Sequence, residues 1–247
     1  MSYREFARVY DQLQADVDYK ARTEYLVKLF EKYDRLPTLL LDVACGTGGF
    51  SFTFAEKGVE VIGADPSPEM LGVAREKFAA AGKEILLLCQ SAEELDLYGT
   101  VDGAVCCLDS LNHIVDEEEL KRSVARISLF LEKDRLFIFD VNTMYKHKEV
   151  LSGNTFAVES DDVFCVWRNS ECDEDGTVDI SLDFFLQDED GRYERSFEDF
   201  SERAYSDTFL KECITEAGLE VVAVLGDMSF DAPNAHEERV IYVTRRV

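Results

Sequence analysis

The chain has few basic residues, and it lacks long apolar runs. Its 26 Lys and Arg stand against 51 Asp and Glu, which leaves a formal net charge of −25. Such a surface repels a polyphosphate backbone unless basic residues gather on one face, and no basic run is present. We therefore do not expect nucleic acid as a partner. No apolar stretch approaches the roughly 18 residues of a membrane span, and residues 1–6 lack the apolar core of a signal peptide, so no membrane association is expected.

Metal-binding and disulfide patterns are also missing. The seven cysteines form no CxxC pair, their number is odd, and most lie in apolar runs, where cysteine behaves as a small hydrophobic residue. His113, His147 and His236 are far apart in sequence and show no ligand spacing, so we expect no metal site. A reduced, cytoplasmic compartment is the simplest prediction.

The pattern of apolar residues predicts an α/β fold. At 247 residues and 46% apolar content, the chain can form one large domain or a domain with an insertion. Near-continuous apolar runs, typical of parallel strands covered on both faces, occur at 39–43, 59–65, 84–89, 101–108 and 136–141. Helical spacing precedes them in residues 1–36 and recurs between them, with predicted caps at Ser67, Asp116 and Ser206. We predict a Rossmann-like, doubly wound, mostly parallel sheet that ends in an antiparallel strand.

Residues 143–204 differ from the rest of the chain. Val178, Ile180, Leu182 and Phe184 alternate with polar residues, which is the period of a half-exposed antiparallel strand. Residues 163–168 and 193–200 have the character of neighbouring strands. The prediction is one domain from 1–142 and 205–247 with a helical amino-terminal cover, and a small antiparallel β insertion at 143–204 that lies over an acceptor site.

Residues 39–50 have the pattern of a buried strand, a glycine turn and the start of a helix. Small residues there let a ligand approach the backbone, although an ordinary strand-to-helix connection has the same pattern. Asp65 ends the next strand, 17 residues after Gly48, where an acid can bind both hydroxyls of a ribose. The alternative is a helix N-terminal acid favoured by the dipole. Ser51 replaces the third glycine of a dinucleotide fingerprint, which disfavours an NAD-dependent oxidoreductase.

Three segments in this region resemble the class I S-adenosylmethionine-dependent methyltransferases. They are Asp42-Val-Ala-Cys-Gly-Thr-Gly48, residues 61–71 and residues 106–112. The resemblance implies S-adenosylmethionine as cofactor, with the turn against its methionine part, Asp65 on the ribose and Met70 on the adenine. The full set of implied cofactor contacts is Tyr10, Tyr19, Asp42, Ala44, Gly46, Gly48, Asp65, Pro66, Met70, Ser91, Ala92, Leu108 and Asp109.

The segment Phe6-Ala-Arg-Val-Tyr-Asp11 is similar to the start of small bacterial members of that family. In those proteins the amino-terminal helices cover the cofactor, so Tyr10 and Tyr19 are candidate lid aromatics, with plain amphipathic packing as the alternative. Three positions depart from the family pattern: Ala44 stands where glycine is usual, Ser91 where aspartate is frequent, and Lys133-Asp134 where a Pro-Gly-Gly turn is usual. The ribose acid and the glycine turn are retained.

The resemblance implies methyl transfer but no particular substrate. The acidity of the chain favours a small molecule or a basic protein over RNA as acceptor, and we expect a small molecule with an N or O nucleophile. An in-line displacement needs a positioned nucleophile, and a general base only if the acceptor arrives protonated; Asp109 and His113 are the candidates. The insertion is expected to cover the acceptor, with candidate substrate residues Asn112, Trp167, Tyr193, Arg195 and Tyr205. A noncatalytic protein that binds S-adenosylmethionine or a partner is the alternative.

Overall fold

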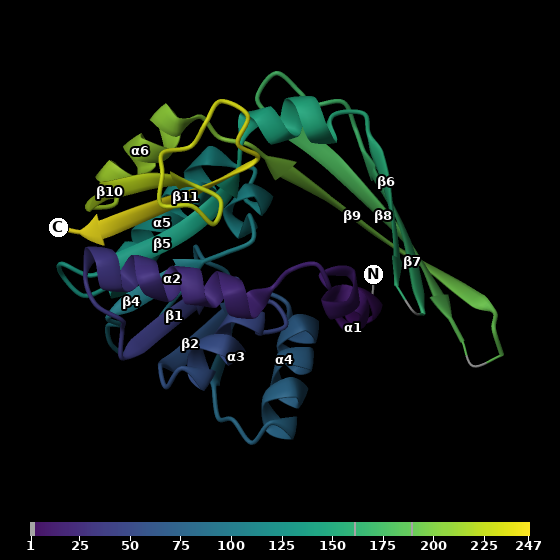
Figure 1. The fold of residues 1–247 in the computed structure, drawn as a ribbon, viewed down its shortest axis with the longest axis horizontal. Helices are drawn as coiled ribbons and strands as arrows, with labels where there is room; N and C mark the ends of the chain where they lie inside the picture. The colour runs from purple at the N-terminus through teal and green to yellow at the C-terminus, as the bar shows by residue number, and fades with distance from the viewer. Residues whose placement is uncertain (1–2, 161, 189) are drawn as a thin grey trace.

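A computed structural model describes residues 3–160, 162–188 and 190–247, without the side chains of residues 3–6 and 8. Two separate sheets organise the chain (Figure 1). The larger has seven strands in the order β10-β11-β5-β4-β1-β2-β3, all parallel except β11, which runs antiparallel to both of its neighbours. The smaller is a four-stranded antiparallel sheet in the order β6-β7-β8-β9. The predicted fold class is therefore confirmed.

The strands of the large sheet are β1 (Leu39–Val43), β2 (Glu60–Asp65), β3 (Leu86–Cys89), β4 (Gly103–Cys106), β5 (Leu136–Asn142), β10 (Leu219–Gly226) and β11 (Arg239–Arg246). The small sheet contains β6 (Thr155–Ser160), β7 (Val163–Asn169), β8 (Thr177–Gln187) and β9 (Tyr193–Arg203). The helices are α1 (Tyr3–Leu13), α2 (Tyr19–Tyr33), α3 (Gly49–Glu56), α4 (Pro68–Ala80), α5 (Glu117–Phe130) and α6 (Asp207–Glu216), with short helices η1 (Ser110–His113) and η2 (Lys146–Leu151).

Side-chain caps begin three of the helices, as predicted. The Ser67 hydroxyl accepts from the backbone N–H of Met70 at 3.2 Å, and Pro68 occupies the first turn of α4. Asp116 and Ser206 cap α5 and α6 through the N–H groups three residues on. These caps satisfy helix N–H groups that have no intrahelical partner, which places each helix start close to its predicted residue.

The helices bury both faces of the large sheet. On one face, α2 and α3 pack Leu29, Phe30 and Phe54 against strand residues such as Leu40. On the other face, α5 and α6 pack against the adjacent position, Leu41, and its neighbours. This double cover explains the near-continuous apolar strands. Among the residues described, no helix is both long and apolar enough to cross a membrane.

Helix α1 lies between the two sheets (Figure 1). Its Val9 is buried in a cluster with Val178, Ile180 and Phe184 of β8, and Leu13 packs against the same cluster. The apolar face of the inserted sheet is therefore partly covered by α1, close to the carboxyl ends of the parallel strands. Strand β6 and the helices η1 and η2 were not predicted, because β6 is a short edge strand and each of the two helices is six residues or fewer.

Candidate active site

The glycine turn after β1 has the predicted open backbone. Ala44, Gly46 and Gly48 all have positive φ, at 55°, 53° and 78°. A Cβ on Gly48 would lie 2.3 Å from Cζ of Phe78, whereas one on Gly46 would meet no atom within 4 Å. Packing thus requires glycine at 48, and the open side at Gly46 leaves backbone accessible to a ligand.

Asp65 at the end of β2 faces this turn. Its carboxylate accepts the backbone N–H of Gly46 at 2.8 Å and that of Ser67 at 2.9 Å. Burial raises the pKa of Asp65 above its usual value, although these two hydrogen bonds oppose the rise. Each oxygen accepts one backbone bond and retains acceptor capacity, so the carboxylate can take both hydroxyls of a ribose. The competing cap is supplied by Ser67, which leaves Asp65 available for this role.

Asp42 lies beneath the turn. It is 2% exposed and accepts the hydroxyl of Ser51 at 2.6 Å, and burial raises its pKa to about 7. Ser51, which occupies the position of a third glycine, thus donates a hydrogen bond to the carboxylate of Asp42 in β1. This placement gives Asp42 a part in shaping the turn, and its contact with a cofactor stays a prediction.

Helix α1 is tied to the turn by its last residues. Thr47 donates to Asp11 at 2.6 Å, and Lys77 of α4 lies 2.6 Å from the same carboxylate. Burial is the largest cause that raises the pKa of Tyr10. The nearby Tyr19 and the charges of Asp109 and Asp65 raise it further. Tyr10 therefore lies within the electrostatic influence of both acids, and its role as a lid aromatic stays a prediction.

The remaining implied cofactor residues lie at the same edge of the sheet. Tyr19 packs its ring on Phe50, with 5.2 Å between centroids, and Met70 is buried at the start of α4. Pro66 follows β2, while Ser91 and Ala92 follow β3. Their contacts with a cofactor stay predictions.

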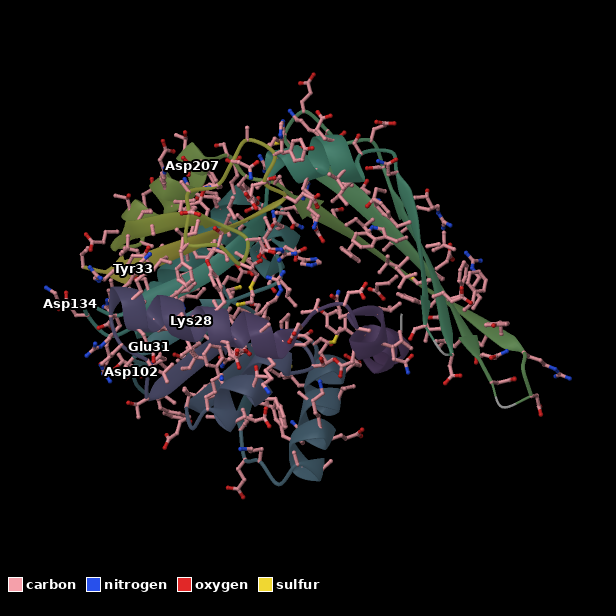
Figure 2. All side chains as sticks on the ribbon, in the orientation of Figure 1. Lys28, Glu31, Tyr33, Asp102, Asp134 and Asp207 are labelled. Atoms are coloured by element: carbon pink, nitrogen blue, oxygen red, sulfur yellow. The ribbon has the colours of Figure 1, made fainter. Side chains whose placement is uncertain are left out.

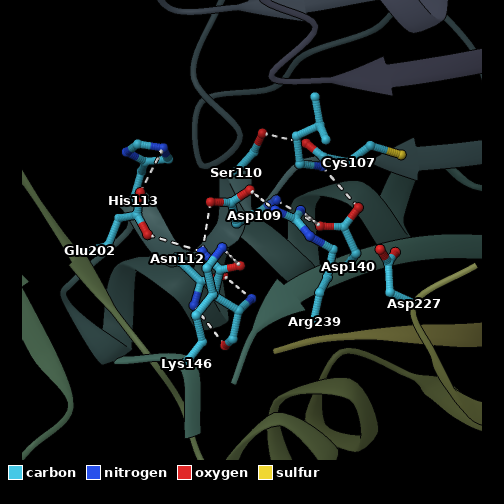
Figure 3. A network of polar contacts seen from close by, with 12 residues as sticks. Cys107, Asp109, Ser110, Asn112, His113, Asp140, Lys146, Glu202, Asp227 and Arg239 are labelled. Atoms are coloured by element: carbon cyan, nitrogen blue, oxygen red, sulfur yellow. Dashed lines mark hydrogen bonds and ion pairs between the residues drawn. The ribbon is translucent and has the colours of Figure 1, made fainter. Parts of the chain in front are cut away.

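A second polar group lies at the carboxyl ends of β4 and β5. Leu108 and Asp109 both have positive φ, at 56° and 52°, and their backbone N–H groups donate to Asp140 at 2.9 and 2.7 Å. Arg239 joins Asp109 to Asp140, with guanidinium distances of 2.6 and 2.5 Å (Figure 3). Such left-handed backbone at two bulky residues persists only where its surroundings hold it. Here the buried Asp140–Arg239 pair holds it.

Asp109 is a largely buried carboxylate surrounded by positive charge. Burial would raise its pKa, but the charges of Arg239, Lys146 and His113 outweigh burial and hold the pKa below its ordinary value. Its oxygens also accept from Arg239 and from Asn142 Nδ2, the latter at 2.7 Å. Asp109 is therefore ionised near neutral pH and is a weak base, and both its role as a general base and its contact with a cofactor stay predictions.

His113 is better placed to accept a proton. Its side chain is 46% exposed, its ring lies 5.0 Å from that of Phe200, and Nε2 is 3.6 Å from Oε1 of Glu202 on β9 (Figure 3). The surrounding protein lowers its pKa, although the carboxylates of Asp109 and Asp65 raise it. The imidazole thus lies at the border between the loop after β4 and the inserted sheet, and its role as a base stays a prediction.

The five predicted substrate residues differ in their placement, and their contacts with a substrate stay predictions. Asn112 is fully buried and bonds the backbone of Asn142 and Arg203; Tyr205 is buried, with its hydroxyl on the carbonyl of Ile114. Tyr193 and Arg195 alternate with Glu202 along β9 and lie on the opposite face, where Arg195 binds Asp183. Trp167 does lie on the inner face but packs on Phe156 and donates to Asn169.

Comparisons with known proteins agree with this geometry. A family model described as a methyltransferase domain matches residues 40–134. The "Putative methyltransferase" of Geobacillus sp. (strain WCH70) is 31% identical over 247 residues, covering 100% of both chains. The corresponding protein of Bacillus subtilis (strain 168) is 30% identical over 100% of this chain and 98% of its own.

A solved structure extends the likeness to the whole fold. The crystal structure of an S-adenosylmethionine-dependent methyltransferase from Clostridium acetobutylicum ATCC 824 superposes with a TM-score of 0.89 at 32% identity, covering 99% of this chain and 98% of that one. The solved structure and the two full-length relatives span both the parallel domain and the inserted sheet. The chain belongs to the class I S-adenosylmethionine-dependent methyltransferases.

Proposed function

We propose that this methyltransferase transfers a methyl group to an amino or hydroxyl group of a small molecule bound between the carboxyl edge of the parallel sheet and the inserted sheet. The observation that carries the proposal is the position of His113. The charges of Asp109 and Asp65 raise its pKa against the effect of burial. Its ring contacts Phe200, and its Nε2 lies 3.6 Å from Oε1 of Glu202 on the inserted sheet.

The residues of the turn fit S-adenosylmethionine. Gly46 offers open backbone, and Asp65 offers two oriented carboxylate oxygens. When bound, the cofactor supplies an electrophilic methyl group on a sulfonium. Tyr10 and Leu108 would then border the reacting groups and exclude water, so that the nucleophile approaches in line.

His113 supplies the proton chemistry. An amine or hydroxyl that attacks the methyl carbon must lose a proton, and a neutral imidazole accepts it. The half-exposed ring can afterwards return that proton to solvent. Asp109 stays ionised beside Arg239, so its negative charge stabilises the imidazolium as it forms.

Relatives support a small acceptor. A glycine/sarcosine N-methyltransferase of Parasynechococcus marenigrum is 30% identical over 132 residues, about half of each chain. A ubiquinone biosynthesis O-methyltransferase of Xanthomonas axonopodis is 34% identical over 105 residues. Since both nitrogen and oxygen acceptors occur among them, the panel that tests this chain must include both.

The test combines binding with methyl transfer. We expect S-adenosylhomocysteine to bind in calorimetry and the labelled methyl group of S-adenosylmethionine to move to a member of a panel of small amines and hydroxyl compounds. His113→Ala should lower kcat by about 100-fold or more, the usual contribution of a general base. His236→Ala, an exposed histidine outside the site, is the matched control.

Two results would count against the proposal. Binding of S-adenosylhomocysteine without methyl transfer to any panel member would favour a noncatalytic cofactor-binding protein. Transfer that is equally fast in His113→Ala would mean that another group, or water, takes the proton.

A further inference from the structure

Two buried groups behind His113 have no role in the reaction described so far. Glu202 of β9 and His147 of η2 are 5% and 0% exposed. Oε1 of Glu202 lies 3.6 Å from Nε2 of His113, and Oε2 lies 3.8 Å from Nε2 of His147. One carboxyl group thus stands between the half-exposed histidine and the fully buried one.

The tautomer of His147 follows from its other nitrogen. Nδ1 lies 2.8 Å from the backbone carbonyl of Gly176, and a carbonyl only accepts, so Nδ1 carries a hydrogen. In the neutral ring, Nε2 is then an acceptor. It is buried without a hydrogen-bond partner among the residues that the structure describes. A buried acceptor of this kind requires a donor, and a protonated Glu202 would be one.

The charges around Glu202 favour that protonated form. Burial raises the pKa of Glu202 well above its usual range, and the negative charge of Asp109 raises it further. Together these effects outweigh Lys146, Asn142 and Arg239, which lower the pKa. Asn142 donates to Oε2 at 3.2 Å, and Lys146 donates to Oδ1 of the same Asn142 at 3.0 Å, so both hold the carboxyl group in place. Burial also lowers the pKa of His147, where Lys146 opposes protonation and Asp109 favours it.

We propose that Glu202 and His147 share one proton and act through His113, with Glu202 as a positioning residue for the base. This rests on the proposed function of His113. When the N–H or O–H bond of the acceptor breaks, an N–H bond forms on His113. The O–H bond of Glu202 then breaks as an N–H bond forms on Nε2 of His147, which leaves a carboxylate facing the new imidazolium. After the proton leaves His113 for solvent, His147 returns its own to Glu202.

The separations of 3.6 and 3.8 Å exceed hydrogen-bond lengths and lie within ion-pair reach. Catalytic groups often have such spacing before a ligand tightens the site. The pair shares its proton, so it titrates as a unit and not as two independent groups.

Nuclear magnetic resonance of the histidine nitrogens tests the pair without an acceptor, because the chain has only three histidines. In the wild type we expect His147 in its Nδ1–H form, and its Nε2 resonance should move toward the protonated position as His113 titrates. Glu202→Gln can still donate to His147 but cannot release a proton, so the His147 movement should be lost. Glu198→Gln, a buried acid on the same strand face, should retain it.

Kinetics supply the second readout. Once an acceptor is found, Glu202→Gln should lower kcat at neutral pH by about tenfold or more with KM little changed, and should alter the pH profile of kcat; a merely structural role would leave that profile in place. A His147 resonance that stays constant while His113 titrates, or that moves equally in Glu202→Gln, overturns the pair. If no panel member is methylated but the coupled movement is seen, the proposed acceptor chemistry fails and the pair stands.

Discussion

Replacing Asp65 by Asn should weaken cofactor binding, in addition to the loss of stability expected for a buried acid that accepts two backbone N–H groups. Each carboxylate oxygen already accepts one backbone N–H, from Gly46 or Ser67, and has capacity for one ribose hydroxyl. Asparagine keeps one acceptor oxygen and no charge. One charge-assisted hydrogen bond is therefore lost and the other becomes neutral.

The size of the effect follows from the two bonds. A hydrogen bond to a charged group contributes about 1.5–3 kcal/mol and a neutral one about 1 kcal/mol, so the loss should be about 2–4 kcal/mol. At about 1.4 kcal/mol per tenfold change, this is an increase of about 30- to 1,000-fold in the Kd for S-adenosylhomocysteine. Isothermal titration calorimetry measures it directly, with urea unfolding alongside to record the change in stability.

Asp102 provides a matched control. It too is a buried acid that accepts backbone N–H groups, from Thr38 at 2.9 Å and Leu39 at 2.7 Å. However, Thr38 and Leu39 lie at the amino end of β1, whereas the glycine turn follows its carboxyl end. Figure 2 labels Asp102. Asp102→Asn should reduce stability and leave the Kd unchanged. An unchanged Kd in Asp65→Asn, or equal losses of affinity in both variants, would refute the ribose contact.

Two further predictions concern the turn. Gly48→Ala should destabilise the protein by about 2–4 kcal/mol in urea unfolding, because φ is 78° and the new Cβ would lie 2.3 Å from the Phe78 ring. Gly58→Ala, with φ 83° and open space, should show only the backbone cost of about 1–2 kcal/mol; equal losses would disprove the clash. Burial raises the pKa of Asp42 from 3.8 to about 7, so its stabilising contribution is complete below pH 3.8 and is lost as pH rises through 7. The free energy of unfolding of Asp42→Asn should therefore fall less between pH 4 and 8 than that of the wild type, by up to about 4 kcal/mol. Parallel curves of unfolding free energy against pH for the two proteins would contradict the titration of a buried Asp42.

The parallel domain was accessible from sequence because its local signals agree. An apolar run predicted β1 at its observed bounds, Leu39–Val43, and Ser67 marked the start of α4. Asp65 could be placed because a parallel strand ends at the edge where ligands bind. Asp140 carries the same signal, an acid near the end of an apolar strand. Its pairing with Arg239 could not be predicted, because 99 residues separate the two. Only the order of strands in the sheet brings β11 beside β5.

The inserted sheet shows why acceptor-facing residues were harder to find. Both faces of strand β9 carry aromatic and charged residues, so its composition does not reveal which face is inward. Aromatic and basic character selected Tyr193 and Arg195, and both lie outward. The turn at 188–191 contained the missing information: it pairs Gln187 with Tyr193, and the same register sets Glu202 opposite Val178. Since Val178 is on the apolar face of β8, a register derived from that turn would have placed Glu202 toward the active site, as a buried acid that requires a partner.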